Sequence, residues 1–178
     1  MNCTKYSLVA FDMDGTLLNK NNEITPVCRQ AIRDAFAAGK EVVLCSGRSP
    51  SEMIDYFSVL PEVKYIIGEN GGILYHVPKD EVICSHPFKK RLAVELSELL
   101  VSDEVLAMCM IKGKAHVSDP QCRHVSEYLP AVFQSLFDER MIHIADMKKL
   151  IRENADSVEK FNIYCKDESA RAVCNSSS

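Results

Sequence analysis

The sequence lacks any apolar run long enough to span a bilayer, which needs roughly 20 consecutive apolar residues. Its N-terminus, MNCTKYSLVAF, holds only a short apolar run that ends at Asp12. A signal peptide would need a longer apolar region and a cleavage site of small residues. We therefore expect a cytoplasmic protein that does not cross a membrane.

The chain also lacks an excess of positive charge. Its formal net charge is −4, with 21 Lys and Arg residues against 25 Asp and Glu residues. Because a mildly acidic chain has no general attraction for nucleic acid or anionic membranes, we expect neither as a partner. Any phosphate-binding site must then be local. The 178 residues are enough for one well-buried domain, or for one core plus part of a second unit, and the 47% that are hydrophobic are typical of a globular protein.

No C-x-x-C pair occurs among the eight cysteines, which are Cys3, Cys28, Cys45, Cys84, Cys109, Cys122, Cys165 and Cys174. Several lie in apolar strand-like runs, where a free cysteine behaves as a small buried hydrophobic residue. Cys122 and His124 are metal-binding residue types, but no second pair accompanies them. The spacing therefore does not predict a zinc site.

The first part of the chain alternates strands with helices. Three continuous apolar runs predict buried strands of the kind found in parallel sheets, the first of them buried on both faces: 8–11, 42–45 and 65–67. Thr25 and Pro26 open one helix, and the capping-box spacing of Ser49 and Glu52 opens another that runs to about Leu60. Since crossovers are right-handed, the three strands should form one parallel sheet.

The pattern changes after Gly72. Two pairs of apolar runs predict hairpins: 73–75 with 82–84, and 105–111 with 115–118. Helices are expected at 92–100, 120–136 and 146–153, with Pro130 as a point where the second could break, and further strands at 141–144 and 158–165. This mixture predicts a separate α+β unit. We expect a core at residues 1–82 and a second domain at 83–178.

The strongest motif is D-M-D-G-T-L at 12–17. Asp12 and Asp14 project to the same side of an extended chain and follow the first strand, where open α/β sheets place their ligands. Two close carboxylates repel each other unless a cation stabilises them, and Mg²⁺ is the usual dication beside phosphate. Asp12 could then attack phosphorus, while Asp14 protonates the leaving oxygen and later takes a proton from water. Gly15 permits the sharp turn, and Thr16 offers a hydroxyl and an amide.

Polar residues also follow the second strand. Ser49 is the better helix cap, which leaves Ser46 available for another task. Gly47 would let main-chain amides face an anion. Arg48 could pair with a phosphate, or it could lie on the exposed first turn of the helix.

These motifs resemble those of the haloacid dehalogenase (HAD) superfamily. D-x-D-G-T-L after the first strand matches its first signature, and Ser46 matches its second, a residue that holds a phosphoryl oxygen. E-N-G-G at 69–72 looks like a segment of the Cof-type branch, whose members mostly dephosphorylate small phosphate esters, often sugar phosphates. Asn70 either contacts the substrate or only shapes a type I′ turn.

The resemblance implies an α/β fold: a HAD-like, Rossmann-type parallel sheet with an inserted α+β cap. It also implies hydrolysis of a small phosphorylated metabolite through an aspartyl-phosphate on Asp12, with Mg²⁺ bound at Asp12 and Asp14. The residues that it assigns to phosphate or substrate binding are Thr16, Ser46, Gly47, Arg48 and Asn70.

Two pieces of the family pattern have no clear counterpart. The chain contains no G-D-x-x-N-D segment, and the lysines in place of the third signature, Lys160 and Lys166, fall within the expected cap. We therefore expect an incomplete core, with an exposed sheet edge and apolar surface. Two rival functions stay open: a phosphotransferase similar to phosphomannomutase, and a non-catalytic remnant that binds phosphate or a partner protein. The sequence leaves the oligomeric state open.

Overall fold

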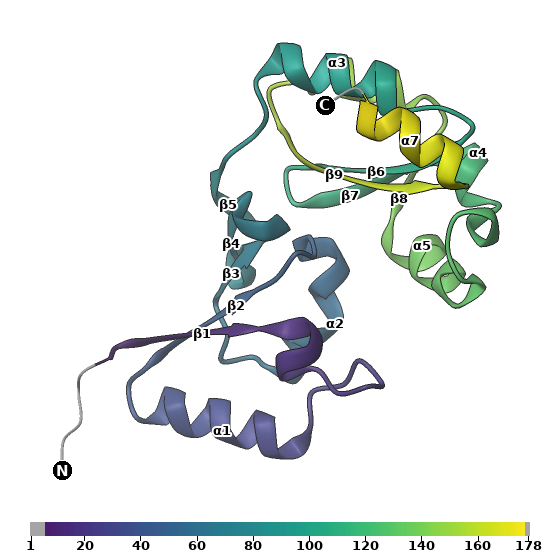
Figure 1. Ribbon diagram of the computed structural model, residues 1–178. Helices are drawn as coiled ribbons and strands as arrows, with labels where there is room; N and C mark the ends of the chain where they lie inside the picture. The colour runs from purple at the N-terminus through teal and green to yellow at the C-terminus, as the bar shows by residue number, and fades with distance from the viewer. Residues whose placement is uncertain (1–5, 177–178) are drawn as a thin grey trace. The chain divides into compact units, whose positions relative to one another are not determined.

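The computed structural model describes residues 6–176 (Figure 1). The chain divides into two compact units, with the boundary between His86 and Pro87. This boundary lies after the expected one at 82/83, because strand β5 (Glu81–Ser85) pairs with a strand of the first unit. Within 6–176, no helix has the length and apolar character that crossing a bilayer requires.

The first unit is built on a five-stranded sheet with the order β1-β2-β3-β4-β5. Besides β5, its strands are β1 (Leu8–Asp12), β2 (Glu41–Cys45), β3 (Tyr65–Gly68) and β4 (Ile73–His76). As predicted, β1, β2 and β3 run parallel. The predicted hairpin of β4 and β5 is also present, and it joins the sheet antiparallel to β3.

Two helices pack against the parallel strands in one apolar cluster. Helix α1 (Pro26–Ala37) begins at Thr25, whose hydroxyl accepts a hydrogen bond from the amide of Cys28. Helix α2 (Ile54–Val59) continues a 3₁₀ turn over Pro50–Met53, so the predicted helix has a tighter first turn than an α-helix. Both helices contribute side chains to the cluster that covers β2 and β3, which fixes the ends of these strands in space.

The expectation that the first strand is buried on both faces is wrong. β1 is an edge strand that pairs only with β2 in the described sheet, and Leu8 is 53% exposed. An apolar run indicates that a segment forms a strand, but how far that strand is buried depends on which elements lie beside it. The exposed edge that we expected of an incomplete sheet is therefore seen at β1.

The second unit has a four-stranded sheet with the order β8-β7-β6-β9. Its strands are β6 (Val105–Ile111), β7 (Lys114–Ser118), β8 (Ile142–Ile144) and β9 (Val158–Cys165). All seven residues of β6 are buried, because alternate side chains enter two separate apolar clusters. Helices α3 (Lys90–Leu100) and α6 (Met147–Glu153) contribute to one cluster, and α4 (Asp119–Cys122) and α5 (Gln134–Arg140) contribute to the other.

The helix predicted over 120–136 is wrong as a single element. The structure has only α4, two 3₁₀ turns and then α5 in this stretch. His124 leaves the helical region with φ −129°, and Pro130 cannot donate a main-chain hydrogen bond. The remaining elements of this unit agree with expectation, and helix α7 (Glu168–Ser176) follows β9.

Candidate active site

The D-M-D-G-T-L segment forms a tight turn directly after β1. Asp14 has φ −72° and ψ 118°, and Gly15 has φ 77° and ψ −1°, which are the values of a type II turn. Such a turn requires a positive φ at its third residue, so Gly15 permits the turn as predicted. Met13 is fully buried beneath the turn and anchors it to the apolar cluster of the first unit.

Asp12 is the last residue of β1 and lies beside Cys45, the last residue of β2, in the parallel register. The hydroxyl of Thr16 donates a hydrogen bond to Asp12 Oδ2 over 2.8 Å. Thr16 was assigned to phosphate, but in the structure its hydroxyl holds the carboxylate of Asp12. One oxygen of that carboxylate is thereby oriented by the turn itself.

Ser46 follows β2 and is tied to the neighbouring strand by its main chain. Its amide donates to the carbonyl of Ile67 over 3.0 Å, and its carbonyl accepts from the amide of Asn70 over 3.1 Å. Its hydroxyl accepts a hydrogen bond from the amide of Arg48 over 3.2 Å. Ser49 forms the predicted capping box with Glu52, so the helix cap does not use Ser46.

The loop after β3 contains three consecutive residues with positive φ: Glu69 (56°), Asn70 (58°) and Gly71 (94°). Asn70 accepts this left-handed conformation more readily than most residues, so it shapes the turn. The same turn presents Asn70 to the pocket described next. Both alternatives that the sequence left open for Asn70 therefore fit its position.

A pocket of about 330 Å³ lies where these three loops come together at the carboxyl ends of the parallel strands. It is lined by Asp12, Cys45, Ser46, Gly47, Ile67, Asn70 and Gly71. Two larger cavities, of about 680 and 400 Å³, contain none of the residues assigned to the nucleophile, the metal or the phosphate, although Lys166 lines the larger one. We take the small pocket as the candidate site, because it holds the carboxylate, the hydroxyl and the amide at the place where open α/β sheets bind ligands.

Asp14 is held by Arg48, an arrangement that neither alternative for Arg48 included. The guanidinium donates from Nε to Oδ2 over 3.0 Å and from Nη2 to Oδ1 over 2.6 Å. The hydrogen bond to Asp14 raises the pKa of Arg48, while its partial burial opposes this effect. The guanidinium also lies over the ring of Tyr56, 5.9 Å from its centre. Neither Arg48 nor Asp14 is among the residues that line the pocket, so the structure shows Arg48 bound to Asp14 and not to the pocket itself.

Cys45 is a pocket residue that the sequence analysis did not assign to the site. Burial raises the pKa of its thiol, and the negative charge of Asp12 adds to the effect. Its position at the end of β2, level with Asp12, was the signal that could have revealed it.

The two candidate lysines belong to the second unit. Lys160 lies within β9, as expected for the α+β unit, and Lys166 forms an ion pair with Glu127 at 2.6 Å. The structure also pairs Cys122 with a different histidine from the one that the sequence suggested. Its sulfur lies 3.9 Å from Nε2 of His143, whereas the sequence analysis considered His124.

A sheet with three parallel strands and a pocket at their carboxyl ends, followed by an α+β unit, defines a two-part α/β protein. Its family is that of the haloacid dehalogenase-like hydrolases, whose model matches residues 9–177. The chain therefore belongs to this family, as its resemblance to the HAD superfamily suggested.

Curated relatives match mainly over part of the chain. A putative phosphatase of Bacillus subtilis, YxeH, is 38% identical over 81 residues, which are 44% of this chain and 30% of the relative. The phosphoglycolate phosphatase of Methanoculleus marisnigri is 33% identical over 85 residues, which are 44% of this chain and 36% of the relative. These alignments cover about a third of each relative's length.

Solved structures with the same fold cover more of the chain. A hypothetical protein from Geobacillus kaustophilus matches 96% of this chain and 62% of its own, with a TM-score of 0.71 and 21% identity. A sugar phosphatase of HAD subclass IIB matches 96% of this chain and 63% of its own, with a TM-score of 0.69 and 17% identity. At these identities the likeness establishes the fold alone, which is the predicted α/β fold with parallel strands in its core.

Proposed function

We propose that this chain carries the nucleophile and the phosphate-binding half of a Mg²⁺-dependent phosphatase. The observation that carries the proposal is the single pocket lined by Asp12, Ser46, Gly47 and Asn70. An acid, a hydroxyl and a side-chain amide around one small cavity are groups that phosphoryl transfer needs. The names of the curated relatives, which are phosphatases, support the same reaction class.

The donor groups at the turn fit a hard dication. The carboxylate of Asp12 and the main-chain carbonyl of Asp14 are oxygen ligands, which Mg²⁺ prefers. Because the carboxylate of Asp14 is engaged by Arg48, we assign its carbonyl rather than its side chain to the metal. When bound, Mg²⁺ would neutralise the repulsion between Asp12 and a phosphate dianion.

In the proposed reaction, a carboxylate oxygen of Asp12 attacks phosphorus and the ester bond to the leaving oxygen breaks. Asp14 gives that oxygen a proton, so an alcohol leaves and an aspartyl-phosphate stays on Asp12. Water then attacks the phosphorus, Asp14 takes its proton, and the bond from Asp12 to phosphorus breaks, which releases orthophosphate and restores the Asp12 carboxylate. Both oxygens of Asp14 accept hydrogen bonds from Arg48, so Asp14 can act as an acid only after this pair opens.

The remaining residues position these two carboxylates and the phosphoryl group. Thr16 holds one oxygen of Asp12 and thereby directs the other toward the substrate. Ser46, Gly47 and Asn70 would bind the phosphoryl oxygens through a hydroxyl, a main-chain amide and a side-chain amide. A preorganised donor of this kind is typically worth about 10²–10³ in rate.

The proposed substrate is a small phosphorylated metabolite of the sugar-phosphate class. The pocket, at about 330 Å³, is near the small end of the range of about 300–1,000 Å³ for ligand sites. We further propose that the second unit, the cap, selects the substrate, and that the protein works in the cytoplasm. The six cysteines whose side chains the structure describes form no disulfide, which suits a reducing compartment.

The test is to trap the covalent intermediate. The chain is incubated with an aryl phosphate and Mg²⁺, then treated with borohydride, which reduces an aspartyl-phosphate to homoserine that mass spectrometry locates. We expect labelling at Asp12, lost when Mg²⁺ is removed and absent from Asp12→Asn. Asp55→Asn, which changes an exposed acid of α2, is the matched control and should retain the label. Turnover that persists in Asp12→Asn would contradict the proposal.

A further inference from the structure

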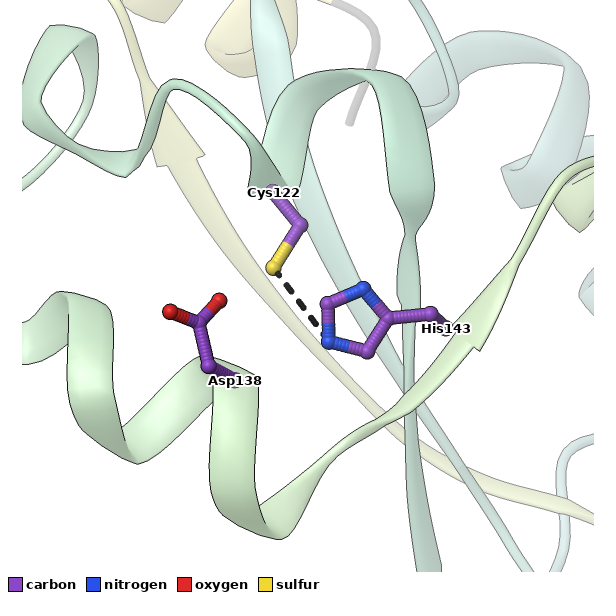
Figure 2. Close-up of side chains that lie close together, drawn as sticks. All are labelled: Cys122, Asp138 and His143. Carbon is purple, nitrogen blue, oxygen red and sulfur yellow. Dashed lines mark hydrogen bonds between the residues drawn. The ribbon is translucent and has the colours of Figure 1, made fainter.

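Three side chains of metal-binding type converge within the second unit. Cys122 is the last residue of α4, Asp138 lies in α5 and His143 is the central residue of β8. One ligand atom from each lies within 4.8 Å of the others (Figure 2). We propose that Cys122, Asp138 and His143 form a binding site for a borderline divalent ion such as Zn²⁺, with a water as the fourth ligand.

The spacing of the Cys122 and His143 ligand atoms is close to that of a tetrahedral ion. Zn–S and Zn–N bonds of about 2.3 and 2.0–2.1 Å place the two atoms about 3.5 Å apart across a tetrahedral angle. Cys122 Sγ lies 3.9 Å from His143 Nε2, the ring nitrogen that faces the cluster. A movement of a few tenths of an ångström would therefore bring this pair to bonding distance. His143 Nε2 also contacts the carbonyl of Phe137 at 3.3 Å, a contact that the ion would replace.

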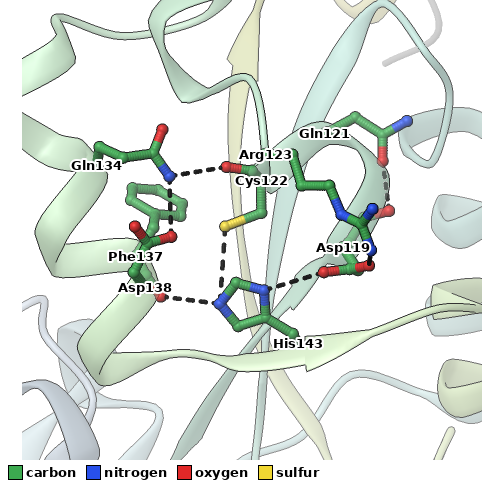
Figure 3. A network of polar contacts seen from close by, with 9 residues as sticks. Asp119, Gln121, Cys122, Arg123, Gln134, Phe137, Asp138 and His143 are labelled. Atoms are coloured by element: carbon green, nitrogen blue, oxygen red, sulfur yellow. Dashed lines mark hydrogen bonds and ion pairs between the residues drawn. The ribbon is translucent and has the colours of Figure 1, made fainter.

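Each exposed ligand is held from behind by a second residue (Figure 3). Nδ1 of His143 lies 3.3 Å from Asp119 Oδ1, and the other oxygen of Asp119 accepts from Arg123 over 2.5 Å. A carboxylate behind the histidine is the usual way to orient an imidazole for a metal and to raise its basicity.

Asp138 has a corresponding support. Nε2 of Gln134 donates to Asp138 Oδ1 over 2.9 Å and to the carbonyl of Cys122 over 3.0 Å. The same amide thus links the carboxylate ligand to the main chain of the thiol ligand, as Figure 3 shows. Because both exposed ligands are supported in this way, the cluster is more than a chance approach of surface side chains.

The contacts from Cys122 to His143 and from His143 to Asp119 place a thiol, an imidazole and a carboxylate in a row, which could also suggest a cysteine nucleophile. Cys122 is fully buried, and burial raises the pKa of its thiol to about 11, with Asp138 and Asp119 adding to the effect. A nucleophilic cysteine instead needs an accessible site and a lowered pKa. The carboxylates that disfavour a bare thiolate favour a cation, whose binding would release the thiol proton to solvent.

The ligand types select the class of ion. Sulfur and imidazole ligands suit Zn²⁺ and Co²⁺, whereas Mg²⁺ and Ca²⁺ prefer oxygen ligands only. The proposed site is therefore distinct in chemistry from the Mg²⁺ site proposed at Asp12, and it lies wholly within the second unit. A bound ion would cross-link α4, α5 and β8, which are three short elements.

The test is titration of the metal-free 178-residue chain with Co²⁺, followed by displacement with Zn²⁺. We expect a thiolate-to-cobalt charge-transfer band that saturates at one equivalent, is lost in Cys122→Ser and is unaffected by millimolar Mg²⁺. His143→Asn and Asp138→Asn should each weaken binding at least about tenfold. Because both of these side chains are exposed, the two variants test the site even if Cys122→Ser folds poorly.

The matched control is a second thiol–imidazole pair in the first unit. Cys84 Sγ lies 3.7 Å from His86 Nε2, also exposed, but outside the cluster of three ligands. Cys84→Ser and Cys45→Ser should both retain the band, which separates the proposed site from chance binding and from the pocket of Asp12. The inference is overturned if folded wild-type chain binds neither ion, or if the band survives unchanged in Cys122→Ser.

Discussion

Arg48 donates two hydrogen bonds to the carboxylate of Asp14, over 3.0 and 2.6 Å, although it lies 34 residues further along the chain. The side chain of Asp14 is 53% exposed and that of Arg48 is 23% exposed, so water screens the pair. Half-exposed pairs are typically worth about 0.2–1 kcal/mol, and a two-pronged geometry places this one toward the upper end.

We predict a coupling free energy of about 0.5–1 kcal/mol between Arg48→Ala and Asp14→Ala in a double-mutant cycle. The free energies are measured by native-state hydrogen exchange of the β2 amides, which reports on the first unit alone. Arg48→Lys should recover only part of the coupling, because an ammonium cannot donate in the same planar geometry. Full recovery by lysine, or coupling that is insensitive to salt, would contradict the assignment.

Thr16→Val should lower the Mg²⁺-dependent turnover of an aryl phosphate by about tenfold, the low end of the effect of losing a partner behind a metal ligand. The reason is that Thr16 orients Asp12 through a 2.8 Å hydrogen bond, which valine cannot make. Thr16→Ser keeps the hydroxyl and should stay close to wild type. Equal losses in the valine and serine variants would show that the methyl group, and not the hydrogen bond, is what matters.

Gly15→Ala should destabilise the first unit by about 1–2 kcal/mol, the usual penalty for an L-residue in a left-handed conformation. A Cβ added at Gly15 would meet no atom within 4 Å, so the penalty comes from the backbone and not from crowding. Gly15→Asn should be milder, because asparagine tolerates a positive φ. Hydrogen exchange of the β1 and β2 amides measures the loss of stability in each variant. An asparagine variant that is destabilised as much as the alanine variant would exclude this explanation.

Cys45 should react with iodoacetamide slowly at pH 8, and its rate should keep rising at higher pH. A raised pKa means that less thiolate is present at a given pH, and the thiolate is the reactive form. Asp12→Asn removes the negative charge that contributes to the shift and should speed the reaction. Peptide mapping by mass spectrometry follows Cys45 beside the exposed Cys84, whose rate the substitution should leave unchanged. If the reaction at Cys45 is not faster in this variant, the charge of Asp12 does not contribute to the raised pKa of the Cys45 thiol.

This chain should turn over an aryl phosphate at least about 10²-fold more slowly than a relative that contains a G-D-x-x-N-D segment. It has no G-D-x-x-N-D segment, and the lysines considered for the third signature, Lys160 and Lys166, lie in the second unit. A missing metal ligand and a missing positive charge act on one site, so their effects need not add. Turnover equal to that of the relative, and abolished by Asp12→Asn, would show that these groups are dispensable or replaced.

Much of the first unit could be predicted because its signals are local. The runs at 42–45 and 65–67 are apolar and bounded by turn residues, and Asp12, Ser46 and Asn70 each follow a strand. Parallel strands bring their carboxyl ends to one edge, so sequence position alone was enough to place these three residues together.

What could not be predicted depends on contacts between distant residues. No local pattern pairs Arg48 with Asp14, or Cys122 with His143, since the approach of each pair is set by how whole elements pack. The break in the helix predicted over 120–136 has a similar origin. Cys122, Val125 and Phe137 all enter one apolar cluster, and a single straight helix is replaced by short pieces that allow this.

Because of the register between β1 and β2, the effect on the site of adding residues to β1 depends on whether their number is odd or even. Asp12 is level with Cys45, so the last side chain of one strand is set beside the last of the other. Side chains alternate faces along a strand, so one residue added within β1 would either turn Asp12 away from Ser46 and Asn70 or move the apolar residues before it to the other face. Adding two would restore the facing. Length variation in this strand is therefore compatible with the pocket only in steps of two.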